Sequence, residues 1–429
     1  MTNTYITHAQ WALSGEYYDL CLGAEGTLEH ALDGIALPGV AAIAPAGTMN
    51  IPAGARVIDA TGKLLLPALF DLHAKIEIEG RSKRECVSRA GQAAIQGGVW
   101  GMLVMPTPAF CFDNASTLDS FHDAVTQRSA AEMIAAGCIS LGMKGEQQAP
   151  YNTLAARGVT ILSDAEHVPG NLLMLHRAMK YASELGLTFA LRGDVPVLTE
   201  KTCMHPGTTS YRLGLHGTPA CAEEIGLETI LRLARDAGAR VHIQTVSTAE
   251  GVRIIRRAKE SGMELTAEVA LHHLLFTHEN VGEYDTTFKT IPPLREQSDS
   301  DALLEGVRDG TIDCIVTDHT PCTPFSKKQD FISAPQGMTA LDTFLPALYT
   351  HLIRPGKLSW GDVVRACSLA PVRIAGPHDL EEDVPTAAPL LLFDPEQERT
   401  VTPELLACGT LNTPMLGQTL LGSVTLPLR

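Results

Sequence analysis

The sequence predicts an α/β protein made of a (β/α)8 barrel and a small β-sandwich domain built from both termini. Three observations favour this fold. The middle of the chain alternates short apolar segments with helical ones, and both ends are rich in short β-type segments. Polar residues also recur at the points where the apolar segments of the middle stop, as they do in barrels whose strand ends share one mouth.

Length and composition support a large enzyme-like domain. The chain has 429 residues, of which 45% are hydrophobic and 19% charged, enough for a barrel with an accessory domain and a sizeable core. The formal net charge of -16 argues against binding to nucleic acid or to an anionic membrane. No apolar run predicts a membrane span, and the start of the chain predicts no secretory signal. Ten scattered cysteines without a CxxC pair indicate reduced thiols and a cytoplasmic protein.

The two ends of the chain are predicted to form the β domain. Segments 5–13 and 17–28 pair apolar runs with turn residues, and segment 389–402 near the other end has the same character. We therefore predict residues 1–66 and 379–429 as the two parts of this domain, and residues 67–378 as the barrel.

Within the barrel, short apolar strands such as 99–106 and 239–247 alternate with helical stretches such as 226–238. Polar residues follow these strands directly: Asp71, His73, Asp164, Arg192, Asp194, Gln244, Thr245, Asp318 and His319. In a closed barrel the carboxyl ends of all strands meet at one mouth, where such folds keep their chemistry. This placement favours a closed barrel over an open, doubly wound sheet.

Several segments resemble the dihydroorotases of the amidohydrolase superfamily in order and spacing. They are LLLPALFDLHAK (64–75), MPTP (105–108), RLGLHGTPACAEE (212–224), LTAEVALHHLLFT (265–277), KTIPPLRE (289–296), IVTDHTPCT (315–323) and LNTPMLGQTLLGSV (411–424). Each string alone is weak evidence, but together they span nearly the whole chain. The resemblance implies a barrel that hydrolyses a cyclic amide with zinc, because a bound metal generates hydroxide and polarises the carbonyl.

The resemblance also implies a ligand set of a His-x-His pair, a bridging carboxylate, two further histidines and a final aspartate that acts as general base. His73 matches the first histidine, Asp164 the bridging carboxylate and Asp318 the final aspartate. The three remaining positions, all histidines in the pattern, are Lys75, Arg192 and Thr245. Protonated lysine and arginine do not serve as zinc ligands.

The positions that the resemblance assigns to substrate binding have changed too. The arginine that follows the His-x-His pair is Glu77, and the other altered positions are Thr107, Ile291 and Cys322. We hypothesise that Lys75 and Arg192 replace the charge of the metal and pair with Asp164 and Asp318, because buried carboxylates need a counter-charge.

Loss of both ligands and substrate contacts predicts a catalytically silent protein that resembles the inactive dihydroorotase-like subunits, in which His73, Asp164 and Asp318 are vestiges of the metal site. No cofactor is then expected, and zinc is the metal expected if one binds. The resemblance implies a homo-oligomer with aspartate carbamoyltransferase as partner, in pyrimidine biosynthesis. One alternative is an active, metal-dependent cyclic amidohydrolase with a reduced or rearranged metal site. Another is a structural oligomer with an unrelated partner.

Several of these residues also have plainer interpretations. His242 lies in a predicted strand and fits a hydrogen-bonded core histidine, and His272 and His273 fit an architectural pair. Lys75 could point out of the mouth into solvent. Cys322 has no matched histidine in the sequence that would make it a nucleophile.

Overall fold

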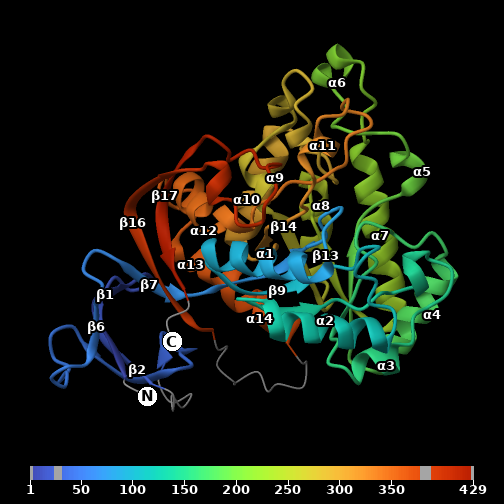
Figure 1. Ribbon diagram of the computed structural model, residues 1–429. Coiled ribbons are helices and arrows are strands. Elements are labelled where there is room, and N and C mark those ends of the chain that lie inside the picture. Colours follow the sequence, from blue (N-terminus) through green and yellow to red (C-terminus); the bar gives the residue numbers. More distant parts are fainter. Residues whose placement is uncertain (1–2, 24–30, 377–387, 427–429) are drawn as a thin grey trace.

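The computed structural model describes residues 3–23, 31–376 and 388–426. It contains a β-rich region formed near the two chain ends and a larger region of parallel strands and helices formed by the middle of the chain (Figure 1). The predicted α/β class is confirmed. The predicted domain boundaries stay predictions: residue 66 lies inside strand β7 (Leu64–Pro67), and residues 378 and 379 lie outside the described residues.

The β-rich region is a seven-stranded sheet of order β17-β16-β7-β1-β2-β5, with β6 paired to β1. β7 pairs antiparallel with β16, so strands from both ends lie side by side (Figure 1). Buried Ile6, Leu20 and Leu392 belong to the core of this region. A two-stranded ribbon, β3–β4, is separate, so the described residues show one large sheet rather than two comparable ones. The other bounds are β1 Thr4–Trp11, β2 Tyr17–Leu22, β3 Ala31–Leu32, β4 Ile35–Ala36, β5 Val40–Pro45, β6 Arg56–Asp59, β16 Leu390–Thr400 and β17 Thr419–Thr425.

The middle of the chain forms two parallel sheets, of order β10-β9-β8 and β11-β12-β13-β14-β15. The two sheets meet at both edges, because Gly137 pairs with Leu162 and Ala74 pairs with His319. These contacts join the strands into a ring, the arrangement of a parallel barrel. Bounds are β8 Leu69–Ala74, β9 Val99–Val104, β10 Glu132–Ala135, β11 Ile161–Leu162, β12 Thr188–Arg192, β13 Arg240–Gln244, β14 Leu265–Ala270 and β15 Cys314–Val316.

Helices connect the parallel strands, and their sequences explain both their ends and their buried faces. In α8 the Thr248 side chain caps the helix start by accepting from the Gly251 N–H, and buried Val252, Ile255 and Ala258 recur every third residue. The longer helices are α1 Lys83–Gln96, α2 Ala115–Arg128, α4 Leu172–Ser183, α7 Ala220–Ala237, α8 Ala249–Glu260 and α10 Gln297–Asp309. The shorter ones are α3 Tyr151–Ala155, α5 Pro196–Thr199, α6 Thr208–Leu213, α9 Leu271–Leu275, α11 Pro324–Lys327, α12 Phe344–Leu348, α13 Trp360–Val364 and α14 Ala370–Ala375.

None of the helices in the described ranges is long and apolar enough to cross a membrane.

The carboxyl ends of three barrel strands have unusual backbone geometry. Ala165, Thr245 and Asp318 follow β11, β13 and β15, and have φ angles of 52°, 45° and 45°. Non-glycine residues rarely adopt positive φ, and such backbone strain clusters at functional sites. These ends therefore mark the barrel mouth as the place to look for chemistry.

Candidate active site

A buried carboxylate–histidine network occupies the barrel mouth between β8, β13 and β14. Glu268, which is fully buried, lies 2.5 Å from Nδ1 of His73 and 3.0 Å from Nε2 of His242. An ionised carboxylate can only accept hydrogen bonds. The Nδ1 of His73 and the Nε2 of His242 therefore each carry a proton and donate it to Glu268. Burial raises the pKa of Glu268, but His73 and His242 outweigh burial and hold that pKa at about 2. His242 is thus a hydrogen-bonded core histidine, and Glu268 fixes the ring of His73.

Asp318 faces this network from the end of β15. Its Oδ1 lies 3.6 Å from Nε2 of His73, and its Oδ2 lies 3.8 Å from Nε2 of His272. Within the described part of the chain its carboxylate accepts no hydrogen bond, although only 6% of the residue is exposed. Burial raises the pKa of Asp318, and His73 and Lys75 partly offset that rise. Asp318 is therefore a buried but unsatisfied acceptor at the mouth.

Lys75 lies beside Asp318, but its partner is a residue that the sequence did not single out. Its Nζ lies 2.6 Å from Oε2 of Glu166, and 12% of the lysine side chain is exposed. Burial lowers the pKa of Lys75, but Glu166 and Asp318 outweigh burial and raise it, so the ammonium stays charged. Burial likewise raises the pKa of Glu166, but Lys75 holds it at about 2. The alternative of a solvated Lys75 is wrong.

Asp164 does not face the mouth, contrary to its predicted place as a bridging ligand. Its carboxylate accepts from the N–H groups of Ile139 and Ser140, at 2.8 and 3.1 Å, and from the Ser140 hydroxyl at 2.5 Å. The left-handed turn at Ala165 redirects the chain after β11, so that Glu166 supplies the carboxylate at the mouth. The hypothesis that Asp164 pairs with Lys75 or Arg192 is therefore wrong.

Arg192, at the end of β12, also has other partners than those predicted. Its Nη2 donates to the backbone oxygen of Glu166 at 3.1 Å and to Oδ2 of Asp194 at 3.3 Å. Thr245, the third replaced ligand, is 2% exposed and follows β13. Neither of them supplies a histidine nitrogen, so the β12 and β13 ends have lost their metal donors.

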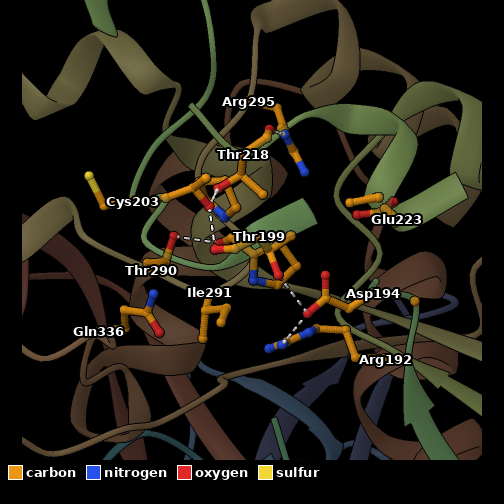
Figure 2. Close-up of a pocket in the computed structure, with 15 residues that line it drawn as sticks. Arg192, Asp194, Thr199, Cys203, Thr218, Glu223, Thr290, Ile291, Arg295 and Gln336 are labelled. Atoms are coloured by element: carbon orange, nitrogen blue, oxygen red, sulfur yellow. Dashed lines mark hydrogen bonds and ion pairs between the residues drawn. The ribbon is translucent and has the colours of Figure 1, made fainter. Parts of the chain in front are cut away.

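The replaced substrate positions divide between two cavities. Glu77, Thr107 and Cys322 line a cavity of about 350 Å³ together with Lys75. The Glu77 side chain there accepts from the Ala109 N–H at 3.2 Å. Ile291 lines a different cavity, together with Arg192 (Figure 2). This cavity is thus lined by Lys75 and by Glu77, an acid where the resemblance implies an arginine.

The residues at the mouth do not fit the zinc centre that the resemblance implies. His73 and Asp318 keep donor atoms near each other, but Asp164 is turned away and Lys75, Arg192 and Thr245 are not zinc ligands. Within the described residues no three or more His, Cys, Asp or Glu side chains are grouped so as to hold a metal ion.

Sequence reasoning did not assign Glu166 or Glu268 to the site, and its interpretation of His272 and His273 as an architectural pair stays a prediction. Both rings of the histidine pair are buried, and none of their four nitrogens has a hydrogen-bond partner among the described residues. Burial lowers the pKa of His272 well below its ordinary value, so its ring is neutral. The signal available was the run of Glu268, His272 and His273 along and just after one strand, which places three polar groups near one strand end.

Comparison with known proteins gives consistent relatives. A family model described as "Dihydro-orotase-like" matches residues 62–251. The dihydroorotase of Mycobacterium leprae is 38% identical over 381 residues, covering 88% of this chain and 89% of the relative. The dihydroorotase of Streptomyces coelicolor is 34% identical over 429 residues, covering 99% and 96%.

Solved structures with the same fold are cyclic-amide hydrolases. The L-hydantoinase (dihydropyrimidinase) of Arthrobacter aurescens has a TM-score of 0.79 and 20% identity, with 99% of this chain and 94% of that chain covered. The dihydropyrimidinase of Brevibacillus agri NCHU1002 has a TM-score of 0.77 and 20% identity, with 98% and 92% covered. At this identity the likeness shows the fold alone.

These relatives contradict the prediction of a catalytically silent subunit. Relatives that match over most of their own length and of this chain carry the name of the enzyme itself, at 33–38% identity. The prediction inferred lost activity from lost ligands, and that step does not follow when other charged groups occupy the same mouth. The expectations of an oligomer, a cytoplasmic location and a carbamoyltransferase partner stay predictions.

Proposed function

The chain belongs to the dihydroorotase family of amidohydrolases, and we propose that it is an active cyclic-amide hydrolase with a rearranged barrel mouth. The observation that carries the proposal is the position of Asp318. Its carboxylate is buried, accepts no hydrogen bond from the described residues, and lies between the His73 ring and the Lys75–Glu166 pair. A free acceptor beside a fixed cation is the pair of groups that amide hydrolysis needs.

Asp318 is the general base in this proposal. It takes a proton from a water molecule while the water oxygen attacks the carbonyl carbon of the ring amide. The same proton then passes to the ring nitrogen as the C–N bond breaks, so one water is consumed and the ring opens to a free carboxylate. His73, whose Nδ1 is held by Glu268 at 2.5 Å, directs its Nε2 toward Asp318 at 3.6 Å.

Lys75 supplies the positive charge at the carbonyl. Its ammonium, held by Glu166 at 2.6 Å, can stabilise the negative charge that grows on the carbonyl oxygen as water attacks. Because Glu166 fixes the ammonium in advance, no reorganisation is needed when the charge develops. Lys75 is thus the residue that we assign to charge stabilisation in place of a metal ligand.

The relatives suggest which rings to test. Their names point to dihydroorotate, and the structural neighbours point to hydantoins and dihydropyrimidines. We propose dihydroorotate as the first substrate, because the sequence relatives are the closer in identity and carry that name. Association with aspartate carbamoyltransferase remains a separate proposal, which co-purification of the two proteins would test.

The experiment is a turnover assay of the full-length protein with dihydroorotate, hydantoin and dihydrouracil. Each ring is assayed after treatment with a chelator and again with added zinc, and metal content is measured in parallel. Ring opening of any of the three supports the proposal, and its loss in Asp318→Asn assigns the base. Absence of ring opening with all three substrates, with and without zinc, would overturn the proposal.

A further inference from the structure

A small polar cavity lies next to the mouth, between the end of β12 and the segment before α10 (Figure 2). Its volume is about 40 Å³. A single water needs roughly 10–15 Å³ on this measure, so the cavity has room for a group of a few atoms, the size of a carboxylate. We name it the arginine pocket, and the residues that matter are Arg192, Arg295, Thr202, Thr218, Thr290 and Gln336.

Arg295 is a buried cation that forms no direct ion pair with the described residues around this pocket. It is 3% exposed; its Nε donates to the Ser247 hydroxyl at 3.1 Å, and its Nη1 donates to the Thr218 backbone oxygen at 2.8 Å. Among the described residues it forms no ion pair, and its Nη2 has no acceptor. A buried charge of this kind is costly unless something pairs with it.

None of the acids near Arg295 forms a direct ion pair with it among the described residues. Glu223 accepts hydrogen bonds from the backbone and hydroxyl groups of Ser247 and Thr248, which occupy its carboxylate. Asp194 is taken by Arg192 and by the Thr199 hydroxyl, each at 3.3 Å. Arg192 and Asp194 therefore pair with each other, and Glu223 reaches Arg295 only through the Ser247 hydroxyl, so the Nη2 of Arg295 remains available to a ligand.

The walls of the pocket are fixed by close packing. A side chain at Gly193 would meet Leu227 at 2.6 Å, and one at Gly226 would meet the Asp194 backbone nitrogen at 2.2 Å. The two glycines therefore let α7 lie directly against the loop that follows β12. The Thr202 and Thr218 hydroxyls, which belong to residues of the same pocket, are 2.7 Å apart and can reorient toward an oxyanion. In Figure 2, Arg295 lies near the top of the view and Arg192 near the bottom, with Thr218 and Thr199 between them in this view.

One residue of the pocket, Arg192, is hydrogen-bonded to the segment that holds a proposed catalytic residue. Arg192 donates to the backbone oxygen of Glu166, whose carboxylate holds Lys75. At the mouth itself, Glu77 stands where an arginine is implied, so that position would repel a carboxylate. Residue 77 therefore offers no group that could bind a carboxylate, while the neighbouring pocket contains Arg295, which forms no direct ion pair with the described residues.

We propose that the arginine pocket binds the carboxylate of the substrate and that Arg295 is a specificity-determining residue. This inference rests on the proposed function, and it selects anionic rings such as dihydroorotate over neutral rings such as dihydrouracil. The guanidinium fork matches the two oxygens of a carboxylate, and Thr218 and Thr202 add hydroxyl donors beside it.

The test compares dihydroorotate with dihydrouracil, two rings that differ by the carboxylate, in the full-length protein. The measured quantity is the ratio of their kcat/KM values. Arg295→Gln should lower this ratio by at least about tenfold, since a hydrogen bond to a charged group contributes roughly 1.5–3 kcal/mol. Arg295→Lys, which keeps the charge, should restore part of the ratio. Arg256→Gln is the matched control, because Arg256 is a surface arginine that pairs with Asp309.

Gln336→Glu keeps the test informative if the Arg295 variants do not fold. The Gln336 side chain lines the pocket and makes no hydrogen bond to the described residues, so this change leaves the contacts of Arg295 intact. It places a negative charge in the pocket and should lower the same ratio by about tenfold or more. An unchanged ratio in both Arg295→Gln and Gln336→Glu would overturn the inference while leaving the proposed function standing.

Calorimetry with orotate, uracil and inorganic phosphate tests the arginine pocket independently of the proposed hydrolase activity. It also distinguishes a site for a substrate carboxylate from a site for free anions. Binding of orotate but not uracil, lost in Arg295→Gln, supports the pocket even if no ring is hydrolysed, in which case only the proposed function fails. Binding of phosphate that needs Arg295, without binding of orotate, would show a site for free anions and overturn the assignment to substrate.

Discussion

Buried carboxylates lie on both sides of the barrel mouth, but the two sides compensate their negative charge with different partners. On one side, which we call the β14–β15 side, the buried carboxylates of Glu268 and Asp318 face the ring of His73 from the neighbouring strand β8. On the β11–β12 side, comprising Glu166 and Arg192 with Lys75 between the two sides, a carboxylate faces fixed cations. Histidine can give and take a proton near neutral pH, whereas lysine and arginine in ion pairs stay charged. Proton transfer therefore belongs to the first side and charge stabilisation to the second.

The largest expected effect comes from the β14–β15 side. Asp318→Asn removes the base, and we expect kcat for the substrate that is turned over to fall by about a hundredfold to ten-thousandfold. Steady-state kinetics at pH 7 measure it, with Asp309→Asn, a surface change near Arg256, as control. If Asp318→Asn has the same kcat as the wild type, Asp318 is not the general base.

Glu268 should matter more for folding than any other acid at the mouth. Glu268→Ala leaves two histidines without their buried partner, and breaking such a pair costs about 3–5 kcal/mol of unfolding free energy. Urea denaturation measures the loss. Glu305→Ala, which removes an exposed partner of Arg308, is the control and should cost less than about 1 kcal/mol. Equal losses in the two variants would show that the network is not a stabilising element.

Lys75 tests the other side of the comparison. Lys75→Met removes the cation from the mouth, and kcat should fall by about a hundredfold to a thousandfold, as for loss of one donor to a developing oxyanion. Lys75→Arg keeps the charge and should retain part of the activity. If Lys75→Met is as active as the wild type, the positive charge comes from elsewhere.

The smallest effect is a pH dependence of stability from the Lys75–Glu166 pair. The pKa of Glu166 is about 2 in the folded protein and 4.5 ordinarily, so its stabilisation is present above pH 4.5 and is lost as the pH falls toward 2. Because 39% of the Glu166 side chain is exposed, solvent screening limits it to about 1 kcal/mol or less. The difference in unfolding free energy between the wild type and Glu166→Gln should be constant from pH 7 to pH 5 and shrink between pH 4.5 and pH 3; a difference that does not change with pH would contradict the pairing.

Sequence patterns predicted the α/β class and brought His73, Lys75 and Asp318 to one mouth, because residues that directly follow parallel strands share an edge. They failed where a single backbone turn decides direction. Asp164 and Glu166 both follow β11, and only the left-handed turn at Ala165 shows which carboxylate faces Lys75. No local pattern reports that turn, since alanine rarely adopts it.

The inference of lost function failed for a different reason. A ligand pattern records which donors a metal site needs, and it says nothing about what other charged groups do at the same place. In the sequence pattern Lys75 stands where a histidine ligand is expected. In the structure it is an ammonium group that Glu166 holds beside Asp318.

The most direct test is ring opening of dihydroorotate by the full-length protein before and after removal of bound metal. The division of work between the two sides of the mouth predicts ring opening in both preparations, because Lys75 supplies the positive charge and Asp318 the base. No ring opening in either preparation would contradict the proposed activity, and ring opening only with added zinc would contradict the assignment of Lys75.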